Sequence, residues 1–545
     1  MNPLDFEHHF FGRKETLQLL KKRVLDLKEG YRHNIAFTGH RYIGKTAVLQ
    51  EFLYNLDDNK VTPIYFDLDH KDIFYFFHKF SASMLYHYLK NKQLPHHDDL
   101  NLLIEEAKRF IPHTVDVIKN IQLNLGKGKL ANSFLGLMAL PEIYTNESGQ
   151  FCVLIFDEFQ ALEEFGIPDV FASLGAKIMT QKKCLYILSS SYKYTAQKIL
   201  AEKLSLLFGN FESVELEAFD IHTSREFTAN LLEGSKMDQN LANFLTEFTG
   251  GYPLYLQLIC KELTNLKVLH QQNEIFLPLV AQSIENLLFD RWGVISRHFE
   301  LIINDWCSGK GNKVISNILI AISMGIQKAE DLLDEVDINK TQLNQKLVKL
   351  QDEGIIFKNG KLFYFKDKLF KYWVKFVYQK RLNGIELTPD RQRIQFRSEF
   401  HNYVDQFQAT AGKDFYSRII ELLGCFENET IDLNGRKYML PTFRDITSEK
   451  LRINQDFFAD IIKADTENST WLIVLKKDSF LENDIVSIIE KARKSSKKIE
   501  KCLIISLSKP DDHAKLKALQ ERFWIWNAEE INMLLNLFDK PYILT

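Results

Sequence analysis

One eight-residue segment constrains the fold of this chain more than any other, because it matches the pattern GxxxxGK[ST] at every fixed position. The segment reads Gly39-His40-Arg41-Tyr42-Ile43-Gly44-Lys45-Thr46. A short apolar, β-prone run (Asn34–Thr38) precedes it, and a helical pattern starts at Lys45. The glycines let the backbone curl until successive N–H groups face a phosphate, and the helix adds the positive end of its dipole. The spacing therefore predicts a phosphate-binding P-loop between a strand and a helix.

The chemistry of this loop predicts a nucleotide with Mg²⁺ as its ligand. We expect all eight residues to surround the phosphates of ATP or a closely related nucleotide. The Lys45 ammonium supplies charge to the β- and γ-phosphates, and the Thr46 hydroxyl is available to Mg²⁺. The alternative is a plain turn between strand and helix, which would have no need of Lys45.

Two acids follow the third predicted strand, at the position of a Walker B motif. Phe151–Phe156 is apolar on both faces, as a central parallel strand should be, and Asp157-Glu158 comes directly after it. We expect Asp157 to hold Mg²⁺ and Glu158 to polarise the attacking water. The alternative is a solvated strand end.

Three serines, Ser189-Ser190-Ser191, end the fourth predicted strand. In P-loop ATPases a polar residue at this point often contacts the γ-phosphate or the lytic water. We favour Ser190 for this role, and an ordinary loop is the alternative.

Strands that alternate with helical stretches are typical of a parallel α/β sheet. Residues 1–222 form the predicted P-loop core, with a long, mostly helical insertion at residues 69–148. For the insertion, extra helical packing is the leading interpretation and a partner surface the alternative. The predicted strands are Asn34–Thr38, Val61–Leu68, Phe151–Phe156, Cys184–Ser189 and Val214–Leu216.

Three further regions follow the core. Residues 223–290 indicate a helical lid, interrupted by Gly250-Gly251-Tyr252-Pro253. Residues 291–385 indicate helices and then two short strands joined by Asn359-Gly360, a strong hairpin signal, and this order is that of a winged helix. Residues 390–545 carry a separate α/β pattern. The predicted fold class is therefore an α/β P-loop NTPase with a parallel sheet and a helical lid, followed by a winged helix and a smaller α/β domain.

Size and composition fit this organisation and exclude several classes of protein. The chain has 545 residues, which suggests three or four domains at roughly 100–200 residues each. A net charge of −3 excludes a polycation wrapped on nucleic acid, although a local basic face stays open. Neither a secretory signal nor a run of about 18 apolar residues is present, so we expect a cytoplasmic protein without a membrane span. The six cysteines show no metal-ligand or redox spacing.

Besides the loop, four segments resemble the archaeal-type ATPase family, which belongs with the STAND and AAA+-related P-loop NTPases. They are Gly12-Arg13 with Glu15, similar to the GRxxE box with its acid one place early; Leu207–Asn210 with Val214–Phe219, similar to the segment after sensor 1; Gly250–Leu254, similar to the lid motif; and Phe365–Trp373, similar to the end of the winged helix.

The resemblance implies several roles. Gly12 and Arg13 would lie near the adenine, and Pro253 with its neighbours would couple the lid to the bound nucleotide. The winged helix would move with nucleotide state. Members of the group work as nucleotide switches, often by assembling, so a homo-oligomer or a protein partner is implied. A helix start at Gly12-Arg13 and a helix stop at Gly250-Gly251 are the local alternatives.

The chain departs from the family where arginine is frequent. Asn210 takes one such position, and Tyr192-Lys193 follows the serines at the other. Because an arginine can add several orders of magnitude to phosphoryl transfer, its absence there implies slow hydrolysis, or an arginine supplied from elsewhere.

Residues 390–545 resemble the PD-(D/E)xK nuclease fold, the restriction-endonuclease-like fold that follows the winged helix in some archaeal-type ATPases. The resemblance implies Asp460 as the first carboxylate and Lys476 as the lysine of that site. The second carboxylate position holds Val474, and the supporting helix acid falls at Tyr416, so the two-carboxylate metal site is broken. A degenerate fold used for binding or assembly is favoured over active cleavage. A mere helix and hairpin is the third alternative.

Three functions stay open from the sequence. The first is a nucleotide-dependent conformational or assembly switch, in which ATP binding and slow hydrolysis rearrange the lid and the winged helix. The second is a DNA-binding protein or ATP-gated nuclease that uses the winged helix and the C-terminal domain. The basic run Ile489–Lys501 would contact phosphates in that case, or would otherwise be a solvated helix face. The third is a scaffold that the nucleotide only stabilises.

Overall fold

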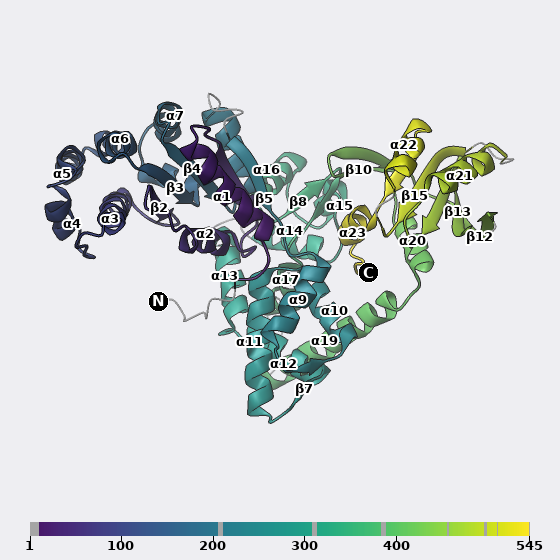
Figure 1. The fold of residues 1–545 in the computed structure, drawn as a ribbon. Helices are drawn as coiled ribbons and strands as arrows, with labels where there is room; N and C mark the ends of the chain where they lie inside the picture. Colours follow the sequence, from purple (N-terminus) through teal and green to yellow (C-terminus); the bar gives the residue numbers. More distant parts are fainter. Residues whose placement is uncertain are drawn as a thin grey trace. The chain divides into compact units, whose positions relative to one another are not determined.

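A computed structural model describes residues 10–204, 211–307, 313–382, 389–454, 457–494, 499–508 and 511–543. The segment Leu207–Asn210 and residues 495–498 of the basic run lie outside the described residues. The chain divides into two compact units. Unit 1 comprises Met1–Phe219 with two later segments, Tyr252–Leu254 and Val348–Ile355, and unit 2 comprises the remaining residues. Figure 1 shows the elements of both units.

Unit 1 is built on a five-stranded parallel sheet with the strand order β2-β3-β4-β1-β5. This confirms the parallel α/β core that the sequence predicts. Strand β1 lies between β4 and β5, so the P-loop that follows it leaves the sheet beside the end of β4. The central strands β1 and β4 are buried along their whole length, and their middle residues are apolar. The strands are β1 (Asn34–Gly39), β2 (Val61–Asp67), β3 (Phe151–Asp157), β4 (Cys184–Ser190) and β5 (Phe211–Leu216).

The predicted insertion before β3 is helical and completes the core of unit 1. Helices α3 (Ile73–Asn91), α4 (Leu100–Ala107), α5 (Pro112–Gly126) and α6 (Leu130–Ser148) lie together in Figure 1. Their apolar side chains share one cluster with those of β2, β3 and β4. The remaining helices of the unit are α1 (Lys14–Lys28), α2 (Lys45–Tyr54), the 3₁₀ helix η1 (Phe159–Phe165), α7 (Val170–Thr180), α8 (Lys193–Lys198) and the π-helical turn η2 (Ile199–Lys203).

Unit 2 begins with the helices predicted as a lid, and its described residues continue into four α-helices and a hairpin. Within the described residues, no helix of either unit combines the length and the apolar character needed to cross a bilayer. The elements are α9 (Ile221–Leu231), β6 (Lys236–Met237), α10 (Gln239–Thr249), α11 (Pro253–Leu269), β7 (Glu274–Ile275), α12 (Leu277–Ile284), η4 (Glu285–Phe289), α13 (Val294–Cys307), α14 (Lys313–Ser323), α15 (Ala329–Asp334), α16 (Lys340–Asp352), β8 (Phe357–Asn359), β9 (Leu362–Tyr364), α17 (Lys368–Trp373), η5 (Val374–Tyr378) and α18 (Gln379–Leu382).

The long helix α19 (Pro389–Ala411) packs on the lid helices, although the sequence analysis placed it at the start of the C-terminal domain. Figure 1 shows it in light green beside α12. The Phe400 ring lies 5.6 Å from that of Phe244 and 5.7 Å from that of Phe248, both on α10. The Arg397 guanidinium forms an ion pair with the buried Glu285 carboxylate of η4. These contacts tie α19 to the lid by both apolar and charged groups.

The C-terminal part of unit 2 contains a five-stranded mixed sheet with apolar clusters on both faces. The strand order is β12-β13-β14-β15-β16, so β16 is an edge strand. Helices α20 and α23 cover one face, and α21 and α22 cover the other. The elements are α20 (Phe415–Leu423), β10 (Glu429–Leu433), β11 (Arg436–Leu440), β12 (Asp445–Asn454), β13 (Phe457–Asp465), β14 (Thr470–Lys476), α21 (Glu482–Lys494), β15 (Ile499–Ser506), α22 (Asp512–Gln520), β16 (Trp524–Trp526) and α23 (Ala528–Leu537).

The predicted hairpin β8–β9 packs against the hairpin β10–β11. The Asn359 side chain donates to the Asp432 carbonyl at 2.8 Å and accepts from the Asp432 N–H at 2.7 Å. A Cβ on Gly360 would lie only 2.0 Å from the Thr430 carbonyl oxygen, so glycine is required at this contact. Leu362 belongs to the apolar cluster under α20. The turn lies at Gly360-Lys361, one residue later than predicted, because Asn359 pairs with Leu362 in the strands.

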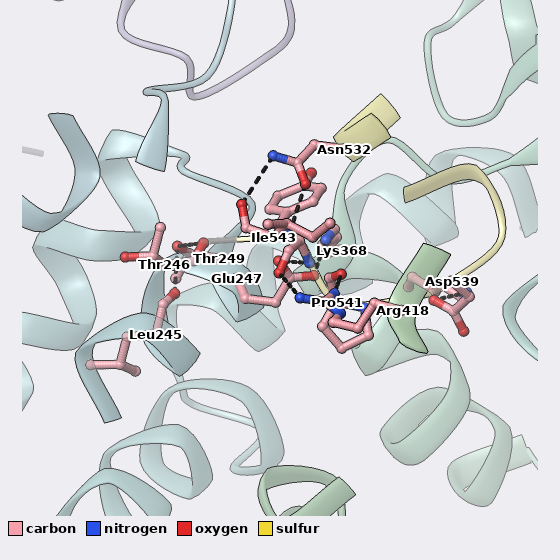
Figure 2. A network of polar contacts seen from close by, with 12 residues as sticks. Leu245, Thr246, Glu247, Thr249, Lys368, Arg418, Asn532, Asp539, Pro541 and Ile543 are labelled. Carbon is pink, nitrogen blue, oxygen red and sulfur yellow. Dashed lines mark hydrogen bonds and ion pairs between the residues drawn. The ribbon is translucent and has the colours of Figure 1, made fainter. Parts of the chain in front are cut away.

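The segment Asp539–Ile543 connects three elements of unit 2 through polar contacts (Figure 2). The Tyr542 N–H donates to the Glu247 carboxylate of α10 at 3.1 Å, and Glu247 also pairs with Lys368 of α17. The Lys368 ammonium lies 3.5 Å from the centre of the Tyr542 ring. From α20, the Arg418 guanidinium donates to the carbonyls of residues 541 and 542. The lid, the helix after the hairpin and the C-terminal sheet therefore meet at one short segment.

Candidate nucleotide-binding site

The P-loop has the backbone conformation that its glycines allow. A Cβ on Gly39 would lie 2.6 Å from the Leu216 carbonyl oxygen, so only glycine fits between β1 and the end of β5. Gly44 has a φ of 96° and Tyr42 a φ of 65°, both in the left-handed region. Helix α2 begins directly after Gly44. The loop and the N-terminus of the helix thus have the backbone arrangement that a phosphate-binding loop needs.

Lys45 is buried beneath this loop. Its ammonium donates to the carbonyls of Gly39 and His40 at 3.0 and 3.1 Å and to the Ser191 hydroxyl at 2.7 Å. Burial lowers the pKa of Lys45, while the Glu158 and Asp157 carboxylates act against this shift. The carbonyls act as neutral ligands, so the positive charge is available to an anion in the loop.

Glu158 is held at the end of β3 by the residue that follows β4. Its carboxylate accepts from the Ser191 N–H at 2.9 Å and from the Ser191 hydroxyl. Glu158 has a φ of 53°, a sparsely populated conformation for a residue with a side chain. The hydroxyl of Ser190, which the sequence analysis favoured, instead accepts from the Tyr192 N–H at 3.0 Å in a local turn. The structure therefore brings Ser191, rather than Ser190, between Lys45 and Glu158.

The side chains of Thr46 and Asp157 are in direct contact. The Thr46 hydroxyl donates to Asp157 Oδ2 at 2.8 Å, and the Tyr65 hydroxyl of β2 donates to the same oxygen at 2.9 Å. The buried Asp157 Oδ1 has no hydrogen-bond partner in the described structure. A carboxylate oxygen without a partner beside a P-loop hydroxyl fits a hard, oxygen-binding cation such as Mg²⁺. Burial and the Asp157 charge raise the pKa of Tyr65, so this phenol stays a proton donor.

An arginine lies in the loop itself. The Arg41 guanidinium lies 5.5 Å from the centre of the Tyr192 ring and 3.5 Å from an Asp69 carboxylate oxygen. Glu158 contributes to the electrostatic environment of this side chain. The sequence analysis found no arginine at Asn210 or after the serines, and counted Arg41 only as a loop residue. Arg41 is therefore a cation whose charge interacts with the Glu158 carboxylate of the same chain.

Gly12 and Arg13 lie against the P-loop and the end of β5. Both have left-handed φ angles, of 69° and 58°. The Arg13 guanidinium donates to the Ile43 carbonyl at 3.4 Å and to the Glu217 carbonyl, and it lies 4.6 Å from the centre of the Phe219 ring. Arg13 thus joins the loop to the strand end, while its predicted position beside an adenine stays a prediction.

His40 of the loop contacts both segments that unit 1 takes from later in the chain. Its ring lies 5.4 Å from that of Tyr252, the neighbour of Pro253 in the lid motif. Its Nε2 lies 3.1 Å from the Gly354 carbonyl oxygen, so His40 donates there when Nε2 carries the proton. Pro253 follows Tyr252 in this segment and begins α11. The lid motif therefore reaches the P-loop through Tyr252.

No protein-family model matches the sequence, and no curated protein matches it significantly. Among solved structures, the chain is similar to a Walker-type ATPase of Pyrococcus abyssi at 16% identity and a TM-score of 0.49, over 68% of this chain and 97% of that one. It is also similar to the ORC2 protein of Aeropyrum pernix in ADPNP and ADP complexes, at 13% identity and a TM-score of 0.42, over 68% and 95%. A third is the ORC1 protein of Aeropyrum pernix in complex with DNA, at 11% identity and a TM-score of 0.38, over 67% and 92%. At these values no function is transferred from those proteins.

The structure separates the two residues of the expected nuclease-like site. Asp460 alternates with Ile461 on β13 and lies on the face of Ile462, under α20. Lys476 lies on the opposite face, where its ammonium donates to the Asp484 carboxylate of α21 at 2.9 Å. The residue that opposes Val474 across the strands is Ile461, an apolar side chain. Among the described residues, no group of three His, Cys, Asp or Glu side chains is placed to hold a metal ion.

Two residues of the nucleotide site were missed by the sequence analysis. Ser191 was among the three serines, but its part in the site depends on where β4 ends. Tyr65 lies on β2 one position before Phe66, and nothing in its local sequence marks it. A signal for Tyr65 does exist in the pairing of the strands. Asp67 of β2 is level with Asp157 of the parallel strand β3, and Tyr65 lies two residues before Asp67, on the same face of β2.

Proposed function

We propose that this chain binds ATP with Mg²⁺ on the Gly39–Thr46 loop, hydrolyses it slowly, and uses it as a conformational switch. The observation that supports this most strongly is the chain of contacts from Lys45 through Ser191 to Glu158. A plain turn between a strand and a helix would need neither the buried ammonium nor the constrained carboxylate. The adjacent pair of Thr46 and Asp157 supplies the oxygens for Mg²⁺.

Each residue has a role that follows from its position. The loop N–H groups and Lys45 would hold the phosphates, and Thr46 and Asp157 would hold Mg²⁺, which neutralises charge on the phosphates when bound. The Glu158 carboxylate would orient a water and accept its proton. Ser191 would keep Glu158 in position and share its hydroxyl with Lys45. Arg41 is the nearest candidate for the arginine that stabilises developing charge.

The contacts of His40 support the switch. Tyr252 and Gly354 touch this loop residue, and the chain continues from them into α11 and β8. Phosphates bound in the loop would shift its backbone. This shift would alter the contacts of His40 with Tyr252 and Gly354. A ligand can shift a conformational equilibrium only through such differential contacts.

Two variants test the site and its activity. Lys45→Ala is expected to weaken ATP binding at least tenfold, because the phosphates lose their main cation. Glu158→Gln is expected to bind ATP within about threefold of wild type while phosphate release falls at least a hundredfold. An ATP affinity of Lys45→Ala equal to that of wild type would refute the site assignment. If wild type and Glu158→Gln both bind ATP and neither releases phosphate, the chain is a nucleotide-stabilised scaffold instead.

Hydrogen exchange tests the switch separately. With Glu158→Gln holding ATP, the segments 252–254 and 348–355 are expected to exchange at rates different from those with ADP. His40→Ala should bring the two rates together while ATP still binds. Identical exchange with ATP and ADP in the otherwise competent protein would contradict the switch and leave the binding site intact.

A further inference from the structure

The edge of the C-terminal sheet carries a groove that the nucleotide site does not involve. It lies between β11 and the edge strand β16, and it has a volume of about 810 Å³. The end of α22 and the start of α23 close its sides. Such a volume falls in the upper range of ligand-binding pockets, so it admits a few units of an extended chain rather than a folded partner.

The groove is lined by more cations than acids. Two carboxylates, of Asp512 and Glu530, face five basic side chains. Glu530 is already engaged, since it accepts from the Asn527 N–H at 2.9 Å in a capping box. The basic side chains come from four different elements or turns, and they are Arg436, Lys437, Lys501, Lys515 and Arg522.

These five cations are not neutralised by the protein. None of them forms an ion pair with a carboxylate in the part of the chain that the structure describes. In contrast, Arg493 on the nearby α21 pairs with Glu521 at 3.5 Å, and Arg444 pairs with Glu467. A group of unpaired cations in a concave surface concentrates the field toward an anion. The charges come from four separate elements or turns around the groove, which suits a ligand with repeated negative charges.

Aromatic side chains lie among the cations. Tyr438, Phe523 and Trp524 line the groove, and the Lys501 ammonium lies 4.5 Å from the centre of the Trp524 ring. The rings of Tyr438 and Trp524 are 4.8 Å apart and nearly perpendicular. A second hollow of about 640 Å³ shares Lys501 and Trp524 with the groove, so the concave surface continues past this pair. Cations interleaved with aromatic rings along an extended concave surface are what single-stranded nucleic acids require.

We propose that the groove between β11 and β16 binds a single strand of nucleic acid, with its cations on the phosphates and its aromatic rings beside the bases. The concave shape argues against a lipid bilayer, which presents its anionic groups on a flat surface. Strand β11 is also held in place, because Asn359 and Gly360 of the β8–β9 hairpin contact β10, the partner strand of β11. This proposal does not depend on ATP binding.

The test uses the full chain and fluorescent oligonucleotides about 20 nucleotides long, as oligo-dT, oligo-U and a DNA duplex. Anisotropy is measured between about 50 and 200 mM salt. The double variant Lys515→Glu/Arg522→Glu reverses two exposed groove cations. The matched control, Lys21→Glu/Lys22→Glu, makes the same change in net charge on exposed positions of α1.

Wild type is expected to bind oligo-dT or oligo-U more tightly than the duplex, with an affinity that falls as salt rises. The groove variant should bind at least tenfold more weakly, and its salt slope should be smaller by about 1.4, the value for two lost single-strand phosphate contacts. The control should stay within twofold of wild type. ATP affinity and the thermal midpoint of unfolding show whether the groove variant is folded. If the charge reversal disturbs folding, the neutral variant Lys515→Gln/Arg522→Gln takes its place and should lose an intermediate amount of affinity. No binding, a preference for the duplex, equal loss in the control, or binding to phosphatidylserine vesicles in place of oligonucleotides would overturn the proposal.

Discussion

Replacing Ser191 by alanine tests the proposed catalytic arrangement most directly. The hydroxyl of Ser191 lies 2.7 Å from the Lys45 ammonium and also donates to the Glu158 carboxylate. Alanine removes both contacts, whereas the N–H of residue 191 still donates to Glu158. A hydrogen bond to a charged group contributes about 1.5–3 kcal/mol. If one such contribution is lost in the transition state, phosphate release should fall about 10- to 150-fold.

The structure supplies a matched control for this variant in the preceding residue. The Ser190 hydroxyl bonds only within its own turn among the contacts described, so Ser190→Ala should change phosphate release less than about threefold. Steady-state phosphate release at saturating ATP gives the rate, and calorimetric titration gives the ATP affinity, which should change less than about fivefold in both variants. A larger effect of Ser190→Ala than of Ser191→Ala would refute the reasoning, because the sensor position would then be the one that the sequence suggested.

Three further outcomes are expected. Thr46→Ala should raise the Mg²⁺ concentration for half-maximal ATP hydrolysis at least tenfold, since the hydroxyl beside Asp157 is lost; an unchanged Mg²⁺ titration would contradict the metal site. Burial raises the pKa of Asp367 to about 6, above its unfolded value, so its contribution to stability is present below about pH 4 and lost as the pH rises through 6. Asp367→Asn should therefore remove up to about 3 kcal/mol of this pH dependence in thermal unfolding at pH 4–7, and an unaltered pH profile would count against it. Glu247→Gln leaves the Lys368 ammonium without its carboxylate partner, so the 539–543 segment should exchange its amide hydrogens faster, by a factor corresponding to roughly 3 kcal/mol. Exchange at the wild-type rate would show that the ion pair is unimportant.

The core of unit 1 was predictable because its signals are local. An apolar run, two glycines at fixed spacing, and two acids after a strand are each contained within a few residues. Strand β5 was expected only from Val214, since its first half contains Glu212 and Ser213 and does not look like a strand. Its pairing with the buried β1 provides the missing stabilisation.

Side-chain direction at strand ends was less predictable. Ser190 and Ser191 differ by one residue, and only the point at which β4 ends decides which hydroxyl faces Lys45. Asp460 and Lys476 raise the same difficulty. The sequence shows how side chains alternate within each strand, but the pairing of Asp460 with Leu475 decides that the two residues lie on opposite faces.

Contacts between distant segments were not predictable at all. The Glu247 carboxylate and the Tyr542 N–H are 295 residues apart in the chain. Each belongs to a local pattern that is complete without the other, a helix and a short loop. Only the three-dimensional packing brings the two together.

The hairpin β8–β9 determines where this protein can be divided. Leu362 fills part of the apolar cluster beneath α20, and Gly360 fits closely over the Thr430 carbonyl. A fragment that begins near residue 390, where the separate C-terminal α/β pattern starts in the sequence, would lack the β8–β9 hairpin. The apolar surface that Leu362 covers would then be exposed to water. The smallest C-terminal piece that can be purified in a folded state should therefore begin before β8. By the same reasoning, an insertion at Gly360 would damage a two-stranded sheet that begins about seventy residues later in the chain, at Glu429.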